Sequence, residues 1–472
     1  MGPRLHIPLE YSSYLIERGR LDSAVETIEQ GKALIWSEVY GLRSSTRRLR
    51  RVNPGFAERL AHFTQAIEAI DTPTPDTFSL AFEELQRHLR GRLEIIQRIQ
   101  ALLGFENFTK SIPFHNLQTA AAKGPVVIIN HCHWRCDILI VLHNLPTSLI
   151  PTSERFYKHT SDLDTRLKDA SQYGLDSEEY RRELRFVLKE LYKLVGQPII
   201  DRLHGLGIPE QSRIWWYPTS VFCSLPLHAM GPVTSTHGPK RYFSDIYICS
   251  YTPTLSALIE SRTARAPRPN PQPSLLLVGQ PDASLPVVWA EMEAVQGLSI
   301  PVTTLSSTHA TRLAVAEGLQ CHDLVHFACH ASLELGKPLE AEIKLHGEDR
   351  LTLHVIANSR LPPAKVAFLS ACHTARPTSR SVCDPTEGLN IAAAMQYHGF
   401  ESVVGTMWNM VDTDGKDVSE SFYQYLLARS GEGCNDPLGE RSARALRDAV
   451  QVLRKKRGMT LERWVNWVHY GA

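Results

Sequence analysis

The 472-residue sequence lacks long hydrophobic runs and has almost no net charge. No stretch of about 18 or more apolar residues occurs, so we expect no transmembrane helix and no membrane partner. The amino-terminal residues have no apolar core or cleavage site of the kind found in a secretory signal. Lys and Arg number 51 against 50 Asp and Glu, which argues against a dominant nucleic-acid surface.

Cysteine is too sparse for a secreted disulfide scaffold. The nine cysteines are odd in number and spread over most of the chain, so we expect free thiols in a reducing, cytoplasmic compartment. With 43% hydrophobic and 21% charged residues, the composition excludes disorder as the main state and predicts a packed core.

Residues 1–115 have the pattern of helices. An amphipathic run at 9–18, a turn at Gly19 and a second run at 21–36 resemble a tetratricopeptide unit. Asp22 or Ser23 is expected to cap the second helix, with Glu26 completing a capping box. One such unit cannot bury its own faces, so it should pack on the next domain or end a longer helical array. Two further helices are expected near 54–70 and 76–103.

A different pattern begins after residue 115. Short apolar runs at 124–130 and 213–220 predict buried strands, 137–142 is a strand or a short buried helix, 242–249 alternates weakly, and 153–206 is helical. Residues 262–274 are rich in proline and predict an extended linker. The expected division is therefore a helical region (1–115), a first half (116–261), the linker (262–274) and a second half (275–472).

The second half alternates between strands and helices. Strands are expected at 274–279, 302–305, 322–330, 365–372 and 399–408, and helices near 286–297, 310–319, 387–398, 416–429 and 437–457. This alternation predicts an α/β fold, a parallel sheet with helices on both faces.

Two of these strands end on reactive side chains, His330 and Cys372. In an open parallel sheet, reactive groups collect beyond the carboxyl ends of the strands, so neighbouring strands would place both at one edge. A nearby imidazole can take the proton of a thiol, which makes the nucleophilic thiolate, and can then protonate a leaving amine. The backbone N–H groups of Ala331 and Cys372 are candidate oxyanion donors.

Structural explanations compete with this one. A cysteine is often simply buried, and a histidine at a strand end is often a polar cap. His373 points away from its neighbour on a strand and is a poor base. His326 shares a face with His330 but lies deeper, and Cys329 points to the opposite face, so we expect both in the core.

The motifs around the pair resemble a known family. The segments VHFACHA (325–331), FLSACHTA (368–375) and EGLNIAAAMQYHGFESVVGTMWNMVD (387–412) resemble the CHAT domain, a caspase- and separase-like cysteine peptidase family of clan CD. The resemblance covers about 115–472. The helical start is similar to the tetratricopeptide end that precedes the domain in fungal members.

The resemblance implies His330 as base and Cys372 as nucleophile. It also implies a caspase-like sandwich in which the half before the linker is degenerate and non-catalytic. The family usually has glycine after the catalytic histidine, whereas this chain has Ala331; if that position needs a positive φ, alanine costs about 1 kcal/mol.

Clan relatives often select a charged residue before the cut. Asp412, Asp384 and Glu387 are therefore candidates for binding a basic substrate residue, with Asp414 a further acid nearby. Alternatively, Asp412 caps the following helix. HCHWRC (131–136) suggests zinc, but no second ligand pair has matching spacing, so no metal or cofactor is expected.

Two functions remain open from the sequence. The first is a cysteine endopeptidase that cleaves protein substrates, regulated by the amino-terminal helices or by a protein partner that they bind. The second is a catalytically weak scaffold or signalling adaptor with the same fold. The presence of both His330 and Cys372 favours the first, and Ala331 favours the second.

Overall fold

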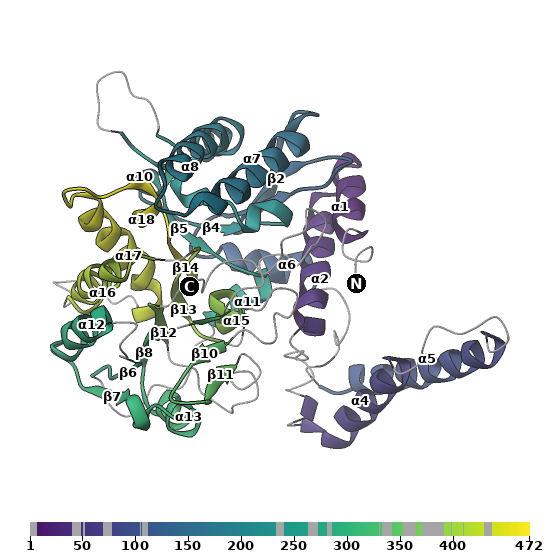
Figure 1. Ribbon diagram of the computed structural model, residues 1–472. Coiled ribbons are helices and arrows are strands. Elements are labelled where there is room, and N and C mark those ends of the chain that lie inside the picture. The colour runs from purple at the N-terminus through teal and green to yellow at the C-terminus, as the bar shows by residue number, and fades with distance from the viewer. Residues whose placement is uncertain are drawn as a thin grey trace. The chain divides into compact units, whose positions relative to one another are not determined.

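The structure is a computed structural model that describes residues 7–39, 49–50, 52–68, 78–103, 105, 112–232, 240–262, 272–280, 286–329, 331–332, 342–352, 365–370, 391–397, 399–408, 410–428 and 437–472. The chain divides into two compact units, and Figure 1 shows their elements. The larger unit comprises Met1–Ile35 and Phe114–Ala472, and the smaller unit comprises Trp36–Pro113. No described helix has the length and hydropathy needed to cross a membrane.

The larger unit is built around a sheet of 11 strands within the described residues. Their order across the sheet is β3 (Leu145–Pro151), β2 (Asp137–Leu142), β1 (Val126–Asn130), β4 (Arg213–Tyr217), β5 (Ile248–Tyr251), β14 (Trp467–Gly471), β13 (Ser402–Thr406), β12 (Val366–Leu369), β8 (Leu324–Ala328), β6 (Leu275–Gly279) and β7 (Val302–Ser306). The central strands are apolar and buried along their length, as expected for strands between two helical layers.

The sheet contains two parallel runs that point in opposite directions, and β2 and β3 extend the first run with antiparallel pairings. Strands β1, β4, β5 and β14 are parallel to one another, and so are β13, β12, β8, β6 and β7. The runs meet where β14 pairs antiparallel with β13. Their carboxyl ends therefore lie at opposite edges of the sheet. This confirms the predicted α/β class with a mostly parallel sheet and a helical amino-terminal region.

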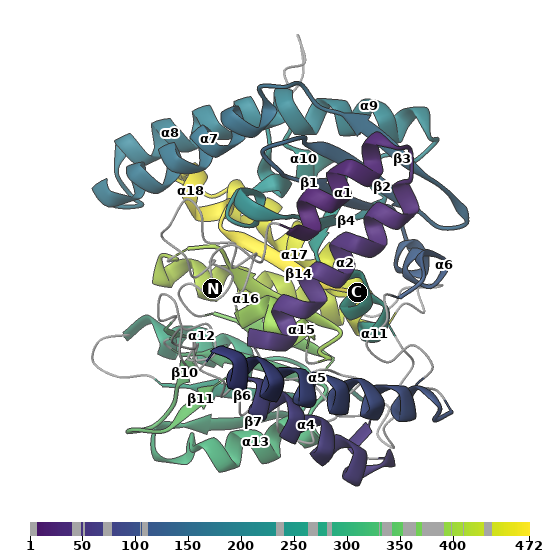
Figure 2. The ribbon, with the colours of Figure 1, turned by 90° about the vertical axis from the view of Figure 1, so that its right-hand side faces the viewer.

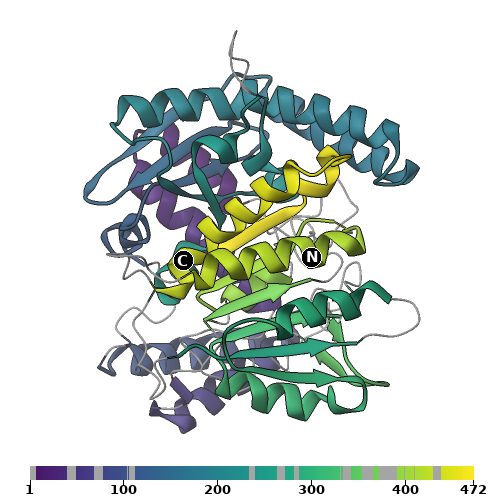
Figure 3. The same cartoon turned by 90° about the vertical axis from the view of Figure 1, so that its left-hand side faces the viewer.

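Helices cover both sides of the sheet. Figure 2 shows α1, α2 and α15 on one side, and Figure 3, seen from the opposite direction, shows α16 and α17 on the other. The helices are α1 (Ile7–Glu17), α2 (Leu21–Val39), α6 (Phe114–Leu117), α7 (Phe156–Ala170), α8 (Glu178–Leu191), α9 (Gln197–Gly205), α10 (Phe243–Ile246), α11 (Leu255–Ser261), α12 (Pro286–Gln296), α13 (Arg312–Cys321), α15 (Ile391–Tyr397), α16 (Asp412–Leu427), α17 (Leu438–Arg454) and α18 (Leu461–Trp464).

Helices α1 and α2 pack on the sheet, as expected for a single helical unit that cannot bury its own faces. They share one apolar core with β1, β2, β4 and α11. The carboxylate of Glu29 is buried and accepts hydrogen bonds from the backbone N–H groups of Leu255 and Ser256, at 2.8 and 2.9 Å. Because these donors begin α11, a side chain of α2 satisfies the free N–H groups at the start of that helix.

The predicted cap of α2 is wrong. The helix begins at Leu21, so Asp22 and Ser23 lie inside its first turn. Glu26 accepts a hydrogen bond from the backbone N–H of Phe114 at 2.6 Å, so it does not complete a capping box. The turn before the helix is at Gly19, which has a φ of +72°.

The smaller unit contains a pair of helices, α4 (Pro54–Glu68) and α5 (Phe78–Gln100). Its apolar core has Leu60, Ile95 and Ile99 at its centre. Gly91 lies against Phe63, and a Cβ there would be 2.5 Å from the ring. The two helices predicted at 54–70 and 76–103 are thus confirmed.

The sequence patterns missed the last strand. The chain was expected to close with helices, but it closes with β14, which lies between β5 and β13. Residues 242–249, whose polar and apolar residues alternate only weakly, contain α10 and the start of β5. Strand β3 was also not predicted.

Gly471 allows β14 to lie close to β13. It has a φ of +104°, and a Cβ there would be 2.2 Å from the carbonyl oxygen of Glu401. The carbonyl of Gly471 accepts a hydrogen bond from Nε1 of Trp215 at 2.7 Å, and this bond joins β14 to β4.

Replacement of Gly471 by alanine is therefore expected to destabilise the larger unit by about 3–5 kcal/mol, since backbone must move to admit the Cβ. Gly458→Ala is the matched control, because Gly458 has a φ of +78° but no atom within 4 Å of the Cβ position. The control should lose only about 1–2 kcal/mol. Urea unfolding measures the free energy of unfolding of both variants. An equal loss in the two would contradict the close approach of β14 to β13.

Candidate active site

Two neighbouring parallel strands, β8 and β12, end at the same edge of the sheet. Their ladder pairs Leu324 with Val366 and continues to Phe327 with Leu369, so each residue faces one 42 positions further along the chain. His330 and Cys372 are also 42 positions apart, two residues after the end of β8 and three after the end of β12. The strands that lead to the two residues are therefore adjacent, parallel and in matching register.

Four of the predicted site residues lie outside the described residues: His330, Cys372, Asp384 and Glu387. Ala331 is described as the first residue of β9 (Ala331–Ser332), which pairs with β10 (Glu342–Lys344) in a small sheet completed by β11 (Arg350–Thr352). Strand backbone is extended and any residue adopts it, so this placement of Ala331 does not call for glycine.

A group of buried polar side chains lies beneath this edge of the sheet. His326 is fully buried and stacks on Phe368, with ring centroids 5.0 Å apart. Its Nδ1 lies 3.2 Å from the hydroxyl of Tyr423, and its Nε2 lies 3.1 Å from Oε1 of Glu291. The other oxygen of Glu291 accepts a hydrogen bond from Ser370 Oγ at 2.9 Å. The group thus links β8, β12, α12 and α16 just below the two strand ends.

Tyr423 is protonated in this group. Burial, together with the negative charge of Glu291, raises the pKa of Tyr423 well above its ordinary value. The phenol lies within hydrogen-bond distance of Nδ1 of His326, while Nε2 of the same ring faces Oε1 of Glu291. That contact is close but not aligned as a hydrogen bond, since neither atom has an aligned partner among the described residues.

Helix α16 packs closely on the same group. A Cβ at Gly415 would lie 2.7 Å from Ser370 Oγ and 2.8 Å from Glu291 Oε2. The glycine therefore lets α16 pass directly over the buried carboxylate. The role of Glu291 and Tyr423 was not predicted, because each has the pattern of an ordinary residue of an amphipathic helix.

Asp412 is the first residue of α16, and its side chain lies outside the described part of the chain. The helix follows β13, which is parallel to β12, so its start lies at the same edge as the ends of β8 and β12. The N-cap position is occupied by Val411. Asp414 is buried and bound by the guanidinium of Arg463, with Nε 2.9 Å from Oδ2, so it is not free to bind substrate.

The thiol nearest to this edge among the described residues is that of Cys329. It is buried, as predicted, and burial raises its pKa to about 12. A thiol in that state is almost wholly protonated at neutral pH and is a poor nucleophile.

The histidines and cysteines at 131–136 lie at the opposite edge of the sheet, beyond β1. His131 is buried between two hydroxyls, with Nε2 2.9 Å from Thr160 and Nδ1 3.1 Å from Ser220, and burial lowers its pKa to about 4. Cys136 donates to the carbonyl of Cys132 at 3.1 Å. Among the described residues, no group of three or more His, Cys, Asp or Glu side chains is placed to hold a metal ion.

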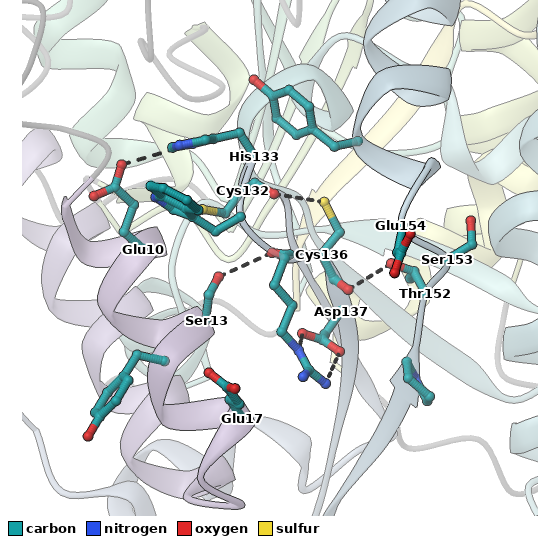
Figure 4. A pocket seen from close by; sticks show the side chains of 15 residues that line it. Glu10, Ser13, Glu17, Cys132, His133, Cys136, Asp137, Thr152, Ser153 and Glu154 are labelled. Atoms are coloured by element: carbon teal, nitrogen blue, oxygen red, sulfur yellow. Dashed lines mark hydrogen bonds and ion pairs between the residues drawn. The ribbon is translucent and has the colours of Figure 1, made fainter.

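A cavity of about 740 Å³ opens beside this segment, between α1 and the loops that follow β1 and β3 (Figure 4). Arg135 binds Asp137 through two hydrogen bonds, of 2.7 and 3.1 Å, and His133 lies 4.0 Å from Glu10. Burial raises the pKa of the Cys136 thiol to about 12. The thiol of Cys136 is therefore a poor nucleophile at neutral pH, and the cavity lies at the edge away from β8 and β12.

Removal of the buried carboxylate should be costly. Glu291→Ala leaves Ser370 and His326 buried without their partner and is expected to lower the free energy of unfolding by about 2–4 kcal/mol. Glu293→Ala, an exposed position two residues along α12, is the control and should change it by less than about 0.5 kcal/mol. If chemical denaturation gives the same free energy of unfolding for both variants, the buried carboxylate does not stabilise the protein.

Comparison with known proteins gives one family match. The CHAT domain matches residues 185–472, which is more than half of the chain. No curated protein sequence matches the chain.

Several solved structures are similar in fold at low identity. A chain of the Saccharomyces cerevisiae separase–securin complex is 11% identical with a TM-score of 0.44, over 99% of this chain and 40% of that one. The Arg-specific cysteine proteinase gingipain R is 10% identical with a TM-score of 0.36, over 68% and 75%. The complex of the pro- and mature domains of Porphyromonas gingivalis RgpB is 9% identical with a TM-score of 0.35, over 68% and 77%.

This chain spans less than half the length of the first of these. The motifs that follow β8 and β12 and the match over residues 185–472 lead to one conclusion: the chain belongs to the CHAT domain family.

Proposed function

We propose that the protein is a cysteine endopeptidase that cleaves protein substrates through Cys372 and His330. The observation that carries the proposal is the ladder between β8 and β12, whose offset of 42 residues equals the spacing of the two side chains. Membership of a family that resembles caspases and separases supports the same reaction. No metal or cofactor takes part in the proposed reaction.

The reaction begins when His330 takes the proton of the Cys372 thiol. The thiolate attacks the carbonyl carbon of the scissile bond, and a C–S bond forms. His330 then gives its proton to the leaving nitrogen as the C–N bond breaks, which leaves a thioester on the enzyme. Water, deprotonated by His330, attacks the thioester, and the C–S bond breaks to release the acid and restore the thiol.

The backbone N–H groups of Ala331 and Cys372 are the proposed donors to the oxyanion. The pairing of Ala331 with Ile343 holds the backbone at the first donor, and Cys372 comes three residues after the end of β12 in the sequence. Preorganised backbone donors of this kind stabilise a developing negative charge without the cost of reorienting water.

We assign recognition of a basic substrate residue to Asp412, with Asp384 and Glu387 as further acids. The position of Asp412 at the start of α16, after a strand parallel to β12, supports its place beside the dyad. Asp414 is left out of this set because Arg463 neutralises it.

The proposed organisation has a helical region (1–115), a non-catalytic half (116–261), a linker (262–274) and a catalytic half (275–472). Regulation acts through the amino-terminal helices or through a protein partner that binds them. The contacts of α2 with α11 support a link from these helices to the sheet.

The direct test of the reaction is covalent labelling by a peptide that carries a thiol-reactive group. The wild-type chain should be labelled at Cys372, Cys372→Ala should not be labelled, and His330→Ala should be labelled at least about 100-fold more slowly, since general-base catalysis contributes about that much. Intact mass and peptide mapping measure the label.

Cys321→Ala is the control, because Cys321, at the end of α13, is an exposed free cysteine of the described residues and a non-selective reagent would react there. Its labelling rate should equal that of the wild type. Labelling that persists in Cys372→Ala refutes the peptidase and leaves the scaffold hypothesis.

Substrate selection is tested separately. Asp412→Asn should reduce the preference for a basic residue before the cut by about tenfold, the effect of losing one charged contact, in a peptide library. Glu420→Gln, an exposed acid on the same helix, should leave the preference unchanged. An unaltered profile in Asp412→Asn removes that residue from the substrate site.

A further inference from the structure

A second cavity of the larger unit is lined by an excess of positive charge. It has a volume of about 350 Å³, within the range of small-molecule sites, and lies over the first turns of α17. Five cationic side chains from four segments line it: Lys123, Arg213, Arg262, Arg441 and Arg444. None of them belongs to β8, β12 or the residues that follow these strands.

Each of the two acidic side chains of the cavity forms an ion pair, and neither partner is an arginine of the cavity wall. Glu440 lies 3.4 Å from Lys123, and Asp448 lies 2.8 Å from Arg447. Within the described residues, no carboxylate lies within 4 Å of Arg213, Arg262 or the other two arginines of the wall. Glu440 offsets part of the charge of Arg213 and Arg262 at longer range, but five cations face two acids, so the cavity keeps an excess of positive charge.

Arg213 and Arg262 converge on one indole ring. Their guanidinium carbons lie 4.5 and 4.3 Å from the ring centre of Trp215. The hydrogen bonds of Arg213 go to neutral groups, the carbonyl of Glu440 at 3.0 Å and the hydroxyl of Ser250 at 2.7 Å. Burying a charge is costly unless an opposite charge approaches it, so a bound anion would stabilise these two guanidinium groups.

The electrostatics agree with this geometry. Burial, together with the positive charge of Arg262, lowers the pKa of Arg213 to about 9, although the negative charge of Glu440 acts in the opposite direction. Burial likewise lowers the pKa of Arg262 to about 10. Both groups remain protonated at neutral pH, and both would be stabilised by a nearby negative charge.

We propose that this cavity binds a small phosphate-bearing molecule, with Arg213, Arg262 and Arg444 around the phosphate. A phosphate group carries nearly two negative charges and three acceptor oxygens, which suits several guanidinium groups better than a single carboxylate does. The first turn of α17 adds the positive end of a helix, and its N-cap, Pro437, makes no side-chain cap. Tyr425, whose side chain is 42% exposed, lines the cavity and offers a ring face to the rest of the ligand.

The test uses pyrophosphate as the probe and thermal unfolding of the full chain as the readout. Pyrophosphate should raise the unfolding temperature in a saturable way, and sodium chloride at the same ionic strength should not. Arg444→Gln should raise the half-saturating concentration about tenfold, the effect of losing one charge-assisted contact. Arg444 is exposed, so its removal leaves the buried contacts of Arg213 intact.

Arg182→Gln is the matched control, since Arg182 is exposed and lies on α8, outside the cavity. It should respond to pyrophosphate as the wild type does. Equal responses in Arg444→Gln and the wild type, or an equal effect of chloride, would overturn the site. A phosphoserine peptide that binds at least about tenfold more tightly than pyrophosphate would overturn the small-molecule class.

Discussion

The parallel pairing of β8 with β12 is the constraint on which the proposed chemistry depends. Parallel neighbours end at the same edge of a sheet, and a fixed register decides which residues face each other there. In this chain the register joins residues 42 apart, from Leu324 and Val366 onward. A shift of one residue would turn the following side chains to the other face. The proposed meeting of His330 and Cys372 therefore depends on the register of the two strands that precede them.

Two features of the structure stabilise the pairing of β8 with β12: a buried group of polar side chains and strand β14. The group of His326, Glu291 and Ser370 joins β8, β12 and α12 in a space that excludes water. Strand β14 then connects the run that contains β12 to the opposite run, and Gly471 allows the close contact. Because the two runs point in opposite directions, the proposed dyad and the large cavity of Figure 4 lie at opposite edges. The candidate anion site lies over the first turns of α17. The proposed catalytic site and the proposed anion site therefore occupy separate parts of the larger unit.

The sequence predicted those features that local patterns encode. Apolar runs marked β8 and β12, and the type of residue at their ends marked the edge, because strand period and strand ends are local properties. It missed β14, since that segment becomes a strand only through partners far away in the chain, β5 and β13. It also treated Asp414 as a free acid, although Arg463, 49 residues later, neutralises it. The role of Glu291 was hidden for the same reason: burial of an acid on a helix depends on tertiary contacts.

The most direct test of the account is the distance between Cys372 Sγ and the nearer ring nitrogen of His330 in a crystal structure of the chain bound to a covalent peptide inhibitor. The account predicts a separation below about 4 Å, within reach of proton transfer when the site is occupied. A separation above about 7 Å, with other side chains between the two groups, would contradict it.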